Sequence, residues 1–305
     1  MQGIAKKTCD VLSMLNSFHS VVIETPDLGL AIREYQLLLG GALPRIEVNA
    51  ARNTRSALFS LQNMRLELRS ADPSVSDASR AEPRLAGIRL GGSASGGIDA
   101  GLAEAKVAHA PPRLEHTERL ENAMSDPLPG ANPRRFRSLA IDPAMSRGLD
   151  VELISEEEPA WSSGIEAQDA DPAAVLGLDH VVVFSGAADL TRRFYEEGLG
   201  IRLALDRTFE KRGVRLLFFR LGGATIEIGS RLNAEVKEDS LDRFGGLAWK
   251  VREIDAIAAR LAEAGVDVSE VRTGHKAGTR VCTVRNQTQG VPTLLIEPVR
   301  EGQTV

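Results

Sequence analysis

The sequence is short of the residues that define several large classes of protein. Its 305 residues include two cysteines, Cys9 and Cys282, which are too few for a disulfide framework or a thiolate metal cluster. No apolar run approaches the roughly 18 residues that a membrane-spanning helix needs. We therefore exclude disulfide-rich scaffolds and fibrous proteins, and we expect no membrane partner.

The chain also lacks an excess of positive charge. It has 37 Lys and Arg residues against 42 Asp and Glu residues, so its formal net charge is −5 at pH 7. A protein that binds nucleic acid usually has a basic surface, and nucleic acid is therefore not an expected partner. The N-terminal residues show no clean apolar stretch with a small-residue cleavage site, so we expect a cytoplasmic protein.

An internal repeat with a period of about 160 residues is the strongest feature of the sequence. Residues 59–68 (FSLQNMRLEL) align without gaps with residues 219–228 (FRLGGATIEI), and Phe, Leu and Glu recur at the same places. Upstream, residues 19–23 (HSVVI) match residues 180–184 (HVVVF). The separation from His to Glu is 48 residues in the first copy and 47 in the second. A length of 305 residues with this repeat predicts two domains.

Each copy has the pattern of a strand, a helix and further strands. The β-branched run after each His predicts a strand, and the helix that follows is expected to begin at an Asp and to end at a Gly. These residues are Asp27 and Gly40 in the first copy, and Asp189 and Gly200 in the second.

A second, more diverged unit follows in each half. In the first half we expect strands at 86–90, 136–141 and 149–154, and a helix at 97–107. In the second half we expect strands at 246–251, 279–285 and 293–298, and a helix at 255–264. Residues 111–135 contain five prolines and are predicted to form a long loop. The predicted organisation is a disordered segment 1–14, a domain 15–155, a linker 156–175, a domain 176–299 and a tail 300–305.

The repeat resembles the vicinal oxygen chelate superfamily, which includes lactoylglutathione lyase, extradiol dioxygenases, methylmalonyl-CoA epimerase and the bleomycin resistance proteins. The matching segments are residues 178–184 (LDHVVVF), 224–228 (ATIEI) and 294–298 (LLIEP). The resemblance extends over residues 15–155 and 176–299. It implies an α+β fold of two tandem domains, each made of two βαβββ units that form an open, incomplete barrel-like sheet.

Members of this superfamily often hold a divalent metal in the cleft of the sheet, with ligands from the first and last strands of each unit. Because alternate residues of a strand face opposite sides, we expect one His and two Glu residues to face each cleft. These are His19, Glu67 and Glu152 in the first domain, and His180, Glu227 and Glu297 in the second. One imidazole and two carboxylates suit zinc, nickel, manganese or iron, with positions left open for a substrate.

Three features leave other interpretations open. The second unit begins at Gly87 and Gly246, where most metal-dependent relatives have a further ligand, and this favours a metal-free cleft. Glu152 lies four residues after a loop glycine, whereas Glu297 lies seven residues after the equivalent glycine. Either one of these two ligand assignments is out of register, or the loop differs between the two copies. A His in a strand is otherwise a packed or surface residue, and a Glu between apolar residues is otherwise the solvated face of a strand.

The resemblance implies three hypotheses for function. The first is a metal-dependent lyase or isomerase that acts on a small substrate with adjacent oxygens, with Glu297 or Glu152 as the base. The second is a metal-free protein that binds a drug or metabolite in its cleft, similar to the bleomycin resistance proteins. The third is an extradiol-type dioxygenase, which the missing second His disfavours. Each predicts a small-molecule partner and a monomer or homodimer.

Overall fold

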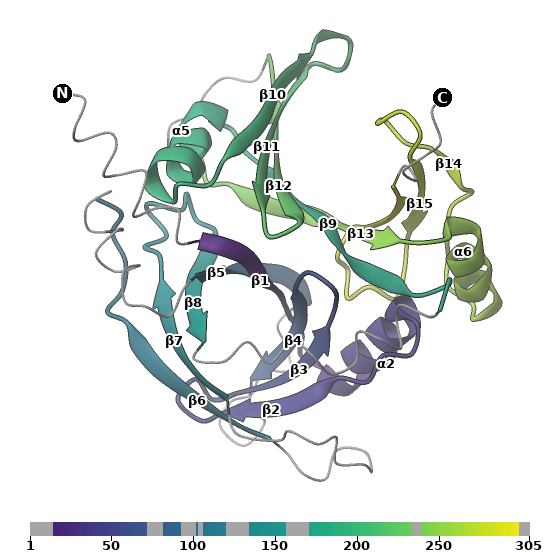
Figure 1. Cartoon of the computed structure of the whole chain (residues 1–305), viewed down its shortest axis with the longest axis horizontal. Coiled ribbons are helices and arrows are strands. Elements are labelled where there is room, and N and C mark those ends of the chain that lie inside the picture. The colour runs from purple at the N-terminus through teal and green to yellow at the C-terminus, as the bar shows by residue number, and fades with distance from the viewer. Residues whose placement is uncertain are drawn as a thin grey trace.

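The computed structural model describes residues 15–71, 82–92, 102, 106–119, 134–156, 171–233 and 239–298. The fold is α+β, with two eight-stranded sheets in tandem and few helices. We call residues 15–156 domain 1 and residues 171–298 domain 2; they form the lower and upper parts of Figure 1. Residues 1–14 and 300–305 and most of the predicted linker and of the predicted helix 97–107 lie outside the described residues.

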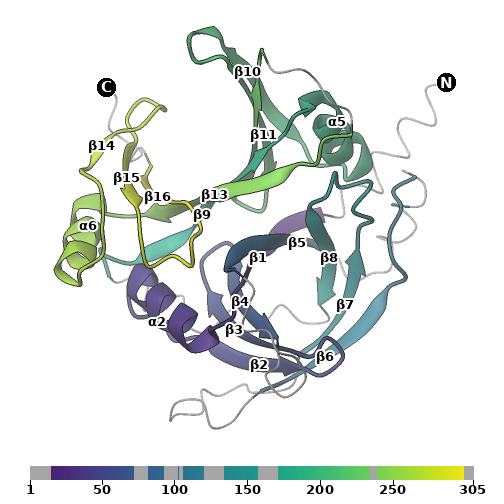
Figure 2. The same cartoon turned by 180° about the vertical axis from the view of Figure 1, so that it is seen from behind.

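Domain 1 forms a closed barrel, whereas an open sheet was expected (Figures 1 and 2). The order of its strands is β1-β4-β3-β2-β6-β7-β8-β5. Within the described residues, the elements of this domain are β1 (Leu15–Glu24), α2 (Leu28–Leu39), β2 (Arg45–Asn49), β3 (Thr54–Ser60), β4 (Arg65–Ala71), β5 (Arg84–Gly92), β6 (Arg113–Arg119), β7 (Arg134–Ala140) and β8 (Asp150–Glu156).

Strand β6 closes the barrel and lies where a long loop was predicted. It pairs with β2 through Glu47 and Val48 on one side and with β7 on the other. Its residues Glu115 and Thr117 are buried, whereas Leu114, which precedes Glu115, is 60% exposed. The usual pattern of a strand, apolar inside and polar outside, is thus inverted here, because the barrel has a polar interior.

Domain 2 forms an open sheet in the order β10-β11-β12-β9-β13-β16-β15-β14, as the sequence predicted. Its first unit contains β9 (Val175–Phe184), α5 (Ala188–Arg193), the π-helical turn η1 (Phe194–Gly198), β10 (Leu203–Phe209), the 3-10 turn η2 (Glu210–Arg212), β11 (Val214–Leu221) and β12 (Ala224–Arg231). Its second unit contains β13 (Arg243–Val251), α6 (Ile254–Glu263), β14 (Arg272–Thr273), β15 (Arg280–Val284) and β16 (Thr293–Glu297).

The predicted helix caps are present in the first copy and differ in the second. Asp27 caps α2 by accepting a hydrogen bond from the backbone N of Leu30 at 2.8 Å, and Gly40 ends the helix with a φ of 92°, a conformation that glycine adopts without strain. In domain 2 the residue before the helix is Ala187. Asp189 lies in the first turn, where it accepts from Arg215 at 3.0 Å; its prediction as an N-cap is wrong.

Two equivalent loops join the domains reciprocally. Arg147, between β7 and β8, donates through Nε to Asp242 of domain 2 at 3.2 Å. Gln289, between β15 and β16, accepts from Thr25 of domain 1 at 2.7 Å and donates to Glu34 at 2.6 Å. Both loop residues have positive φ, 57° and 52°. Buried apolar residues of both domains also form one continuous core, so the domains pack as a single unit.

No helix in the described parts of the chain has the length and apolar composition needed to cross a membrane.

Candidate functional site

The pairing of the strands shows which residues are equivalent in the two domains. The Glu that recurs in both copies lies beside a valine of the first strand, and the pairs are Glu227 with Val182 and Glu67 with Val22. The residue two positions before this valine is His180 in domain 2 and Ser20 in domain 1. Ser20, and not His19, therefore has the position of His180. The difference between 48 and 47 residues in the repeat is this offset of one residue.

The last strands of the two domains also align differently from the prediction. Glu152 lies beside Arg89 in the parallel pair of β8 and β5, and Leu294 lies beside Ala248 in the parallel pair of β16 and β13. Arg89 and Ala248 are equivalent, because they lie opposite Ser20 and His180 respectively. The counterpart of Glu152 is therefore Leu294, which also follows its loop glycine by four residues.

Glu297 lies on the other face of the sheet from His180. Its Oε2 accepts a hydrogen bond from the backbone N of Ile254, at the start of α6, at 3.0 Å, and lies 3.7 Å from Arg280. The expectation that Glu297 faces the cleft is wrong, because Leu295, fully buried on this helix-facing side, sets the phase of β16. Its carboxylate holds the N-terminus of a helix, where a negative charge is favoured.

His180 and Glu227 meet on the concave face of the domain 2 sheet. The Nε2 atom of His180 lies 3.6 Å from Oε2 of Glu227, and its Nδ1 atom lies 2.9 Å from Oδ1 of Asp179. The two side chains of the His180–Glu227 pair are 16% and 20% exposed. The imidazole is thus held between two carboxylates and keeps a small part of its surface exposed to solvent.

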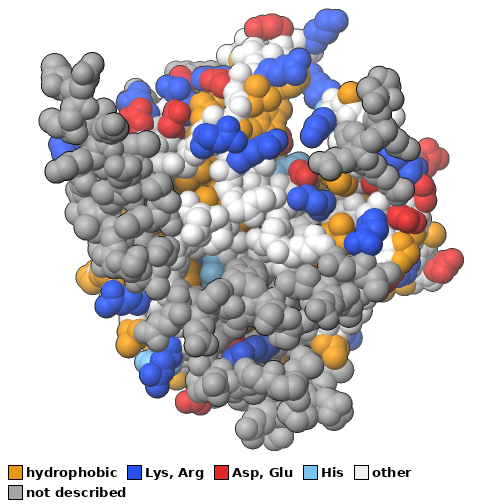
Figure 3. All heavy atoms as spheres, in the orientation of Figure 1, with side chains coloured by type: hydrophobic (Ala, Val, Ile, Leu, Met, Phe, Trp, Pro, Cys, Tyr) orange, Lys and Arg blue, Asp and Glu red, His pale blue; other side chains and the backbone are white. Residues whose placement is uncertain are grey.

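An apolar surface surrounds this pair. The strand pairing places half-buried or exposed apolar side chains on the same face of the sheet; they are Val182, Phe184, Leu205, Leu216, Phe218 and Leu294. Phe184 is 41% exposed, and the guanidinium of Arg243 lies over its ring, 4.6 Å from the centroid. Figure 3 shows Lys and Arg side chains gathered around the open side of this domain. The face therefore suits a molecule with an apolar body and an anionic group.

The electrostatic surroundings of His180 favour its protonated form. Burial on its own lowers the pKa of the imidazole, but the hydrogen bond with Asp179 and the negative charge of Glu227 outweigh burial, so the pKa is raised above its ordinary value of 6.5. The pKa of Asp179 is lowered in turn, since its hydrogen bond to His180 and the nearby Lys250 and Lys276 outweigh burial.

We predict that His180 stays protonated above pH 6.5. Because its pKa is higher in the folded than in the unfolded protein, its contribution to stability is complete below about pH 6.5 and is lost as the pH rises through the folded pKa. An NMR titration of the imidazole checks this, and Asp179→Asn is expected to lower the pKa. A pKa at or below 6.5 in the unaltered protein, or no change in Asp179→Asn, would contradict the prediction.

The other family ligand positions of domain 2 provide no donors for a metal. Gly246 has a φ of 148°, and a Cβ atom there would lie 2.4 Å from the carbonyl oxygen of Pro292, so no side chain fits. Leu294 is apolar. His180 and Glu227 thus supply two ligands, fewer than the three or four of ordinary protein zinc sites. Within the described ranges, no three His, Cys, Asp or Glu side chains lie together as a metal site.

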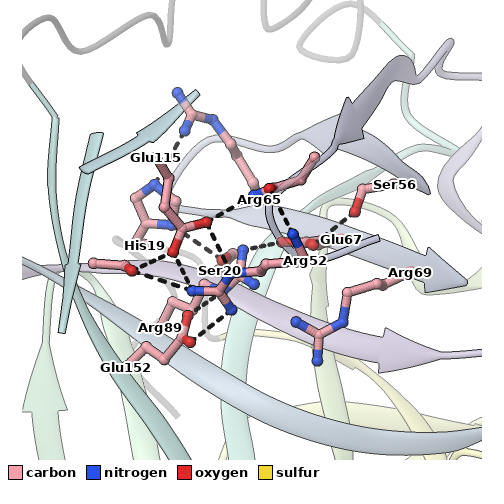
Figure 4. A network of polar contacts seen from close by, with 12 residues as sticks. His19, Ser20, Arg52, Ser56, Arg65, Glu67, Arg69, Arg89, Glu115 and Glu152 are labelled. Atoms are coloured by element: carbon pink, nitrogen blue, oxygen red, sulfur yellow. Dashed lines mark hydrogen bonds and ion pairs between the residues drawn. The ribbon is translucent and has the colours of Figure 1, made fainter. Parts of the chain in front are cut away.

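In domain 1 the predicted ligands face the interior of the barrel and contact arginines (Figure 4). Nη1 of Arg65 lies 3.1 Å from Nε2 of His19. Arg89 pairs with Glu67 through Nη1, and its Nε lies 3.1 Å from Oε2 of Glu152. All three predicted ligands are thus in contact with a guanidinium, and this donor set does not fit a metal ion.

Arg52 extends this network across the barrel. Its guanidinium donates to Glu115 at 2.8 Å and to Glu152 at 2.7 Å, and Glu115 also accepts from Asn49 at 2.7 Å. A cavity lies among these side chains, with about 20 Å³ open to the centre of a water molecule. This is room for one or two waters and not for an organic substrate. The interior of domain 1 is therefore filled by its own side chains.

Several of these functional residues were not predicted from the sequence. Asp179 was visible only as the residue before His180, and the interior arginines Arg52, Arg65 and Arg89 have the appearance of ordinary surface residues. Arg89 had one recognisable signal: it lies between Ile88 and Leu90 in an apolar strand, on the same face as Gly87.

Comparison with known proteins identifies relatives of this fold. Residues 177–291 match the family described as Glyoxalase/Bleomycin resistance protein/Dioxygenase superfamily. A mutant 4-hydroxymandelate synthase from Streptomyces coelicolor is 15% identical, with 94% of each chain covered and a TM-score of 0.61. A halotolerant catechol dioxygenase is 12% identical over 93% of this chain and 87% of its own, with a TM-score of 0.57.

A shorter protein matches part of the chain. Methylmalonyl-CoA epimerase from Mycobacterium tuberculosis is 26% identical, covering 42% of this chain and 91% of its own, with a TM-score of 0.35. No curated protein matches the chain in sequence. The two long matches extend over both domains, so the two-domain arrangement is shared with solved proteins.

Proposed function

We propose that this chain, whose residues 177–291 belong to the Glyoxalase/Bleomycin resistance protein/Dioxygenase superfamily, binds one small amphipathic molecule on the concave face of domain 2. His180 and Glu227 would be the polar contacts of this molecule, and the apolar side chains around them would contact its body. In this proposal domain 1 supports domain 2 and has no ligand site of its own. Binding would need no metal ion.

The contrast between the two sheets is the observation that carries the proposal. The sheet of domain 2 is open, and its polar pair lies in the middle of an apolar, partly exposed surface. The sheet of domain 1 is closed, and its interior holds paired charges and room for little more than water. Ligand sites are typically concave and mostly apolar, with a few convergent polar groups, and the surface around His180 and Glu227 has this composition.

The chemistry of His180 and Glu227 indicates which polar groups the ligand would carry. A protonated His180 donates through Nε2 to an anionic or carbonyl oxygen, and Glu227 accepts from a hydroxyl or amine. The arginine at the rim, Arg243, favours an anionic group and stacks on aromatic rings. Two solved proteins that share the two-domain arrangement, a hydroxymandelate synthase and a catechol dioxygenase, are named for small aromatic oxygen compounds, which agree with this class of ligand.

A fluorescence titration tests the proposal. The probe is 8-anilinonaphthalene-1-sulfonate, an apolar aromatic anion, added to the folded protein in the presence of EDTA. We expect one saturable site per chain. Val182→Glu places a charge in the middle of the concave face and is expected to weaken binding at least about tenfold, since the charge would be buried against the probe.

Leu43→Glu is the matched control. Leu43 is 67% exposed and belongs to domain 1, so this variant introduces the same charge away from the concave face, and binding of the probe should be unchanged. Equal binding by the unaltered protein and Val182→Glu would refute the proposed site. Binding that disappears in EDTA would refute its independence from metal.

A second candidate function is the metal-dependent lyase or isomerase. The distance of 3.6 Å between Nε2 of His180 and Oε2 of Glu227 favours it, because two ligands at about 2.0–2.1 Å from one ion lie about 3–3.5 Å apart. Asp179 would then orient the imidazole, as carboxylates do for metal-bound His. About one metal per chain by mass spectrometry, lost in His180→Ala, would favour this function; no bound metal would favour the first.

A further inference from the structure

The interior of domain 1 contains a constellation that the proposed function does not use. Glu67 and Glu152 extend from β4 and β8, on opposite sides of the central pair of strands β1 and β5. Arg89 extends from β5 between them and contacts both carboxylates. All three side chains are nearly inaccessible, with exposures of 6% to 10%. A cation thus joins the last strands of the two units across the centre of the barrel.

We propose that guanidinium groups take the place of a divalent ion in domain 1, with Arg89 as the bridging cation. Arg89 contacts Glu67 and Glu152, and Arg52 contacts Glu152 from the other side at 2.7 Å. Glu67 and Glu152 are thereby contacted by two guanidinium cations, of which Arg52 is shared with Glu115. Buried carboxylates require such compensation, and here the chain provides it from its own side chains.

Comparison with domain 2 supports this assignment. The equivalent of Arg89 is Ala248 and the equivalent of Glu152 is Leu294, as the strand pairing shows. Domain 2 therefore has neither the bridging cation nor the second carboxylate, and the arginine and the glutamate are present or absent together. This pattern is expected if the role of Arg89 is to neutralise the two carboxylates and not to stabilise the barrel in general.

The inference does not depend on the proposed function, because it concerns the other domain. It predicts that domain 1 binds no divalent ion while Arg89 is present, and that removing the guanidinium converts Glu67 and Glu152 into ion ligands. His19, whose Nε2 lies 3.1 Å from Nη1 of Arg65, is the imidazole of the same polar network (Figure 4).

The test is a cobalt titration of the full chain. All proteins carry His180→Ala and Glu227→Gln, so that domain 2 contributes no ion. Arg89→Ala is expected to bind about one Co²⁺ per chain by equilibrium dialysis, to show cobalt absorption bands, and to unfold at a higher temperature when Co²⁺ is added. The chain with Arg89 intact is expected to show none of these effects.

Two further variants distinguish the bridging role from a general loss of buried charge. Arg89→Lys keeps a cation at the site and should bind no cobalt. Arg69→Ala removes another buried arginine, whose 2.9 Å partner is Glu24, and should also bind no cobalt. Addition of Glu67→Gln to Arg89→Ala should abolish the cobalt binding of the latter.

Either of two results would overturn the inference. The first is a folded Arg89→Ala protein, by circular dichroism, that binds no more cobalt than Arg69→Ala. The second is cobalt binding by the chain with Arg89 intact, if Glu67→Gln then abolishes that binding. This second result is decisive even if Arg89→Ala does not fold. Failure of the proposed ligand site in domain 2 would affect neither result, because that site is disabled throughout.

Discussion

Replacing Arg52 with alanine is expected to lower the free energy of unfolding by about 3 kcal/mol at neutral pH, near the lower end of values for breaking a buried ion pair. The side chain of Glu115, which pairs with Arg52, is 3% exposed, and that of Glu152 is 9% exposed. Removing the guanidinium leaves both carboxylates buried with fewer partners. Urea denaturation of the full chain measures the loss.

The effect of Arg52→Ala is also expected to depend on pH. Burial on its own raises the pKa of Glu115, but hydrogen bonds from Arg52 and Ser138 and the charge of Arg52 outweigh it, so the pKa lies below its ordinary value of 4.5. A carboxylate with a lowered pKa stabilises the fold above that ordinary value and loses this contribution as the pH falls through the folded pKa. The cost of Arg52→Ala should therefore be largest near neutral pH and smaller in acid.

An exposed ion pair provides the control for Arg52→Ala. Arg285 and Asp267 lie 2.8 Å apart with side chains that are 53% and 54% exposed. Exposed pairs contribute about 0–1 kcal/mol, so Arg285→Ala should change the free energy of unfolding by less than about 1 kcal/mol. Similar losses for Arg52→Ala and Arg285→Ala would mean that the barrel interior is not the buried network described above.

Replacing Arg147 with alanine is expected to cost a similar amount, about 3 kcal/mol at neutral pH, because it breaks a buried ion pair between the domains. The side chain of Arg147 is 9% exposed, and that of its partner Asp242 is fully buried. Burial already raises the pKa of Asp242 above its ordinary value of 3.8, although hydrogen bonds from Thr191 and Ser185 and the charge of Arg147 oppose it.

The pH dependence of Arg147→Ala follows from this raised pKa. A carboxyl group with a raised folded pKa favours the fold at low pH, and this contribution is lost as the pH rises through the folded pKa. Loss of Arg147 raises the pKa of Asp242 further, so the cost of Arg147→Ala should be larger at pH 8 than at pH 5. Asp242→Asn in the same chain should recover part of the loss, and a cost that neither pH nor Asp242→Asn alters would contradict this account.

The internal repeat was sufficient to predict the two-domain fold. The apolar strands and the cap residues Asp27 and Gly40 are local signals, and α2 and most strands could be predicted from them. Strand β6 was missed because its buried residues are Glu115 and Thr117, and the rule that buried strand residues are apolar fails in a barrel with a polar interior.

The candidate site was harder to predict, because it depends on register. In residues 293–297 (TLLIE) three apolar residues follow one another, so local alternation allows two phases, and only packing of Leu295 against the helix side selects one. The match of His19 with His180 failed for a similar reason. Strands β1 and β9 have the same β-bulge, at His19 and at Asp179 respectively, so His19 has the position of Asp179 and Ser20 has the position of His180.

The two copies have therefore diverged in opposite directions. Domain 1 keeps two carboxylates and neutralises them with arginines inside a closed barrel. Domain 2 keeps the imidazole and one carboxylate, on an open apolar face. This difference explains why the polar pair of domain 2 is more exposed than the buried carboxylates of domain 1.

The central claim is that the open face of domain 2 is the ligand site and that the interior of domain 1 is not. The most direct test is a crystal structure of the protein grown with 8-anilinonaphthalene-1-sulfonate and EDTA. The account predicts probe density on the concave face, next to His180 and Glu227, with its sulfonate toward Arg243. Probe density inside the barrel of domain 1, or an empty concave face with the probe bound elsewhere, would contradict it.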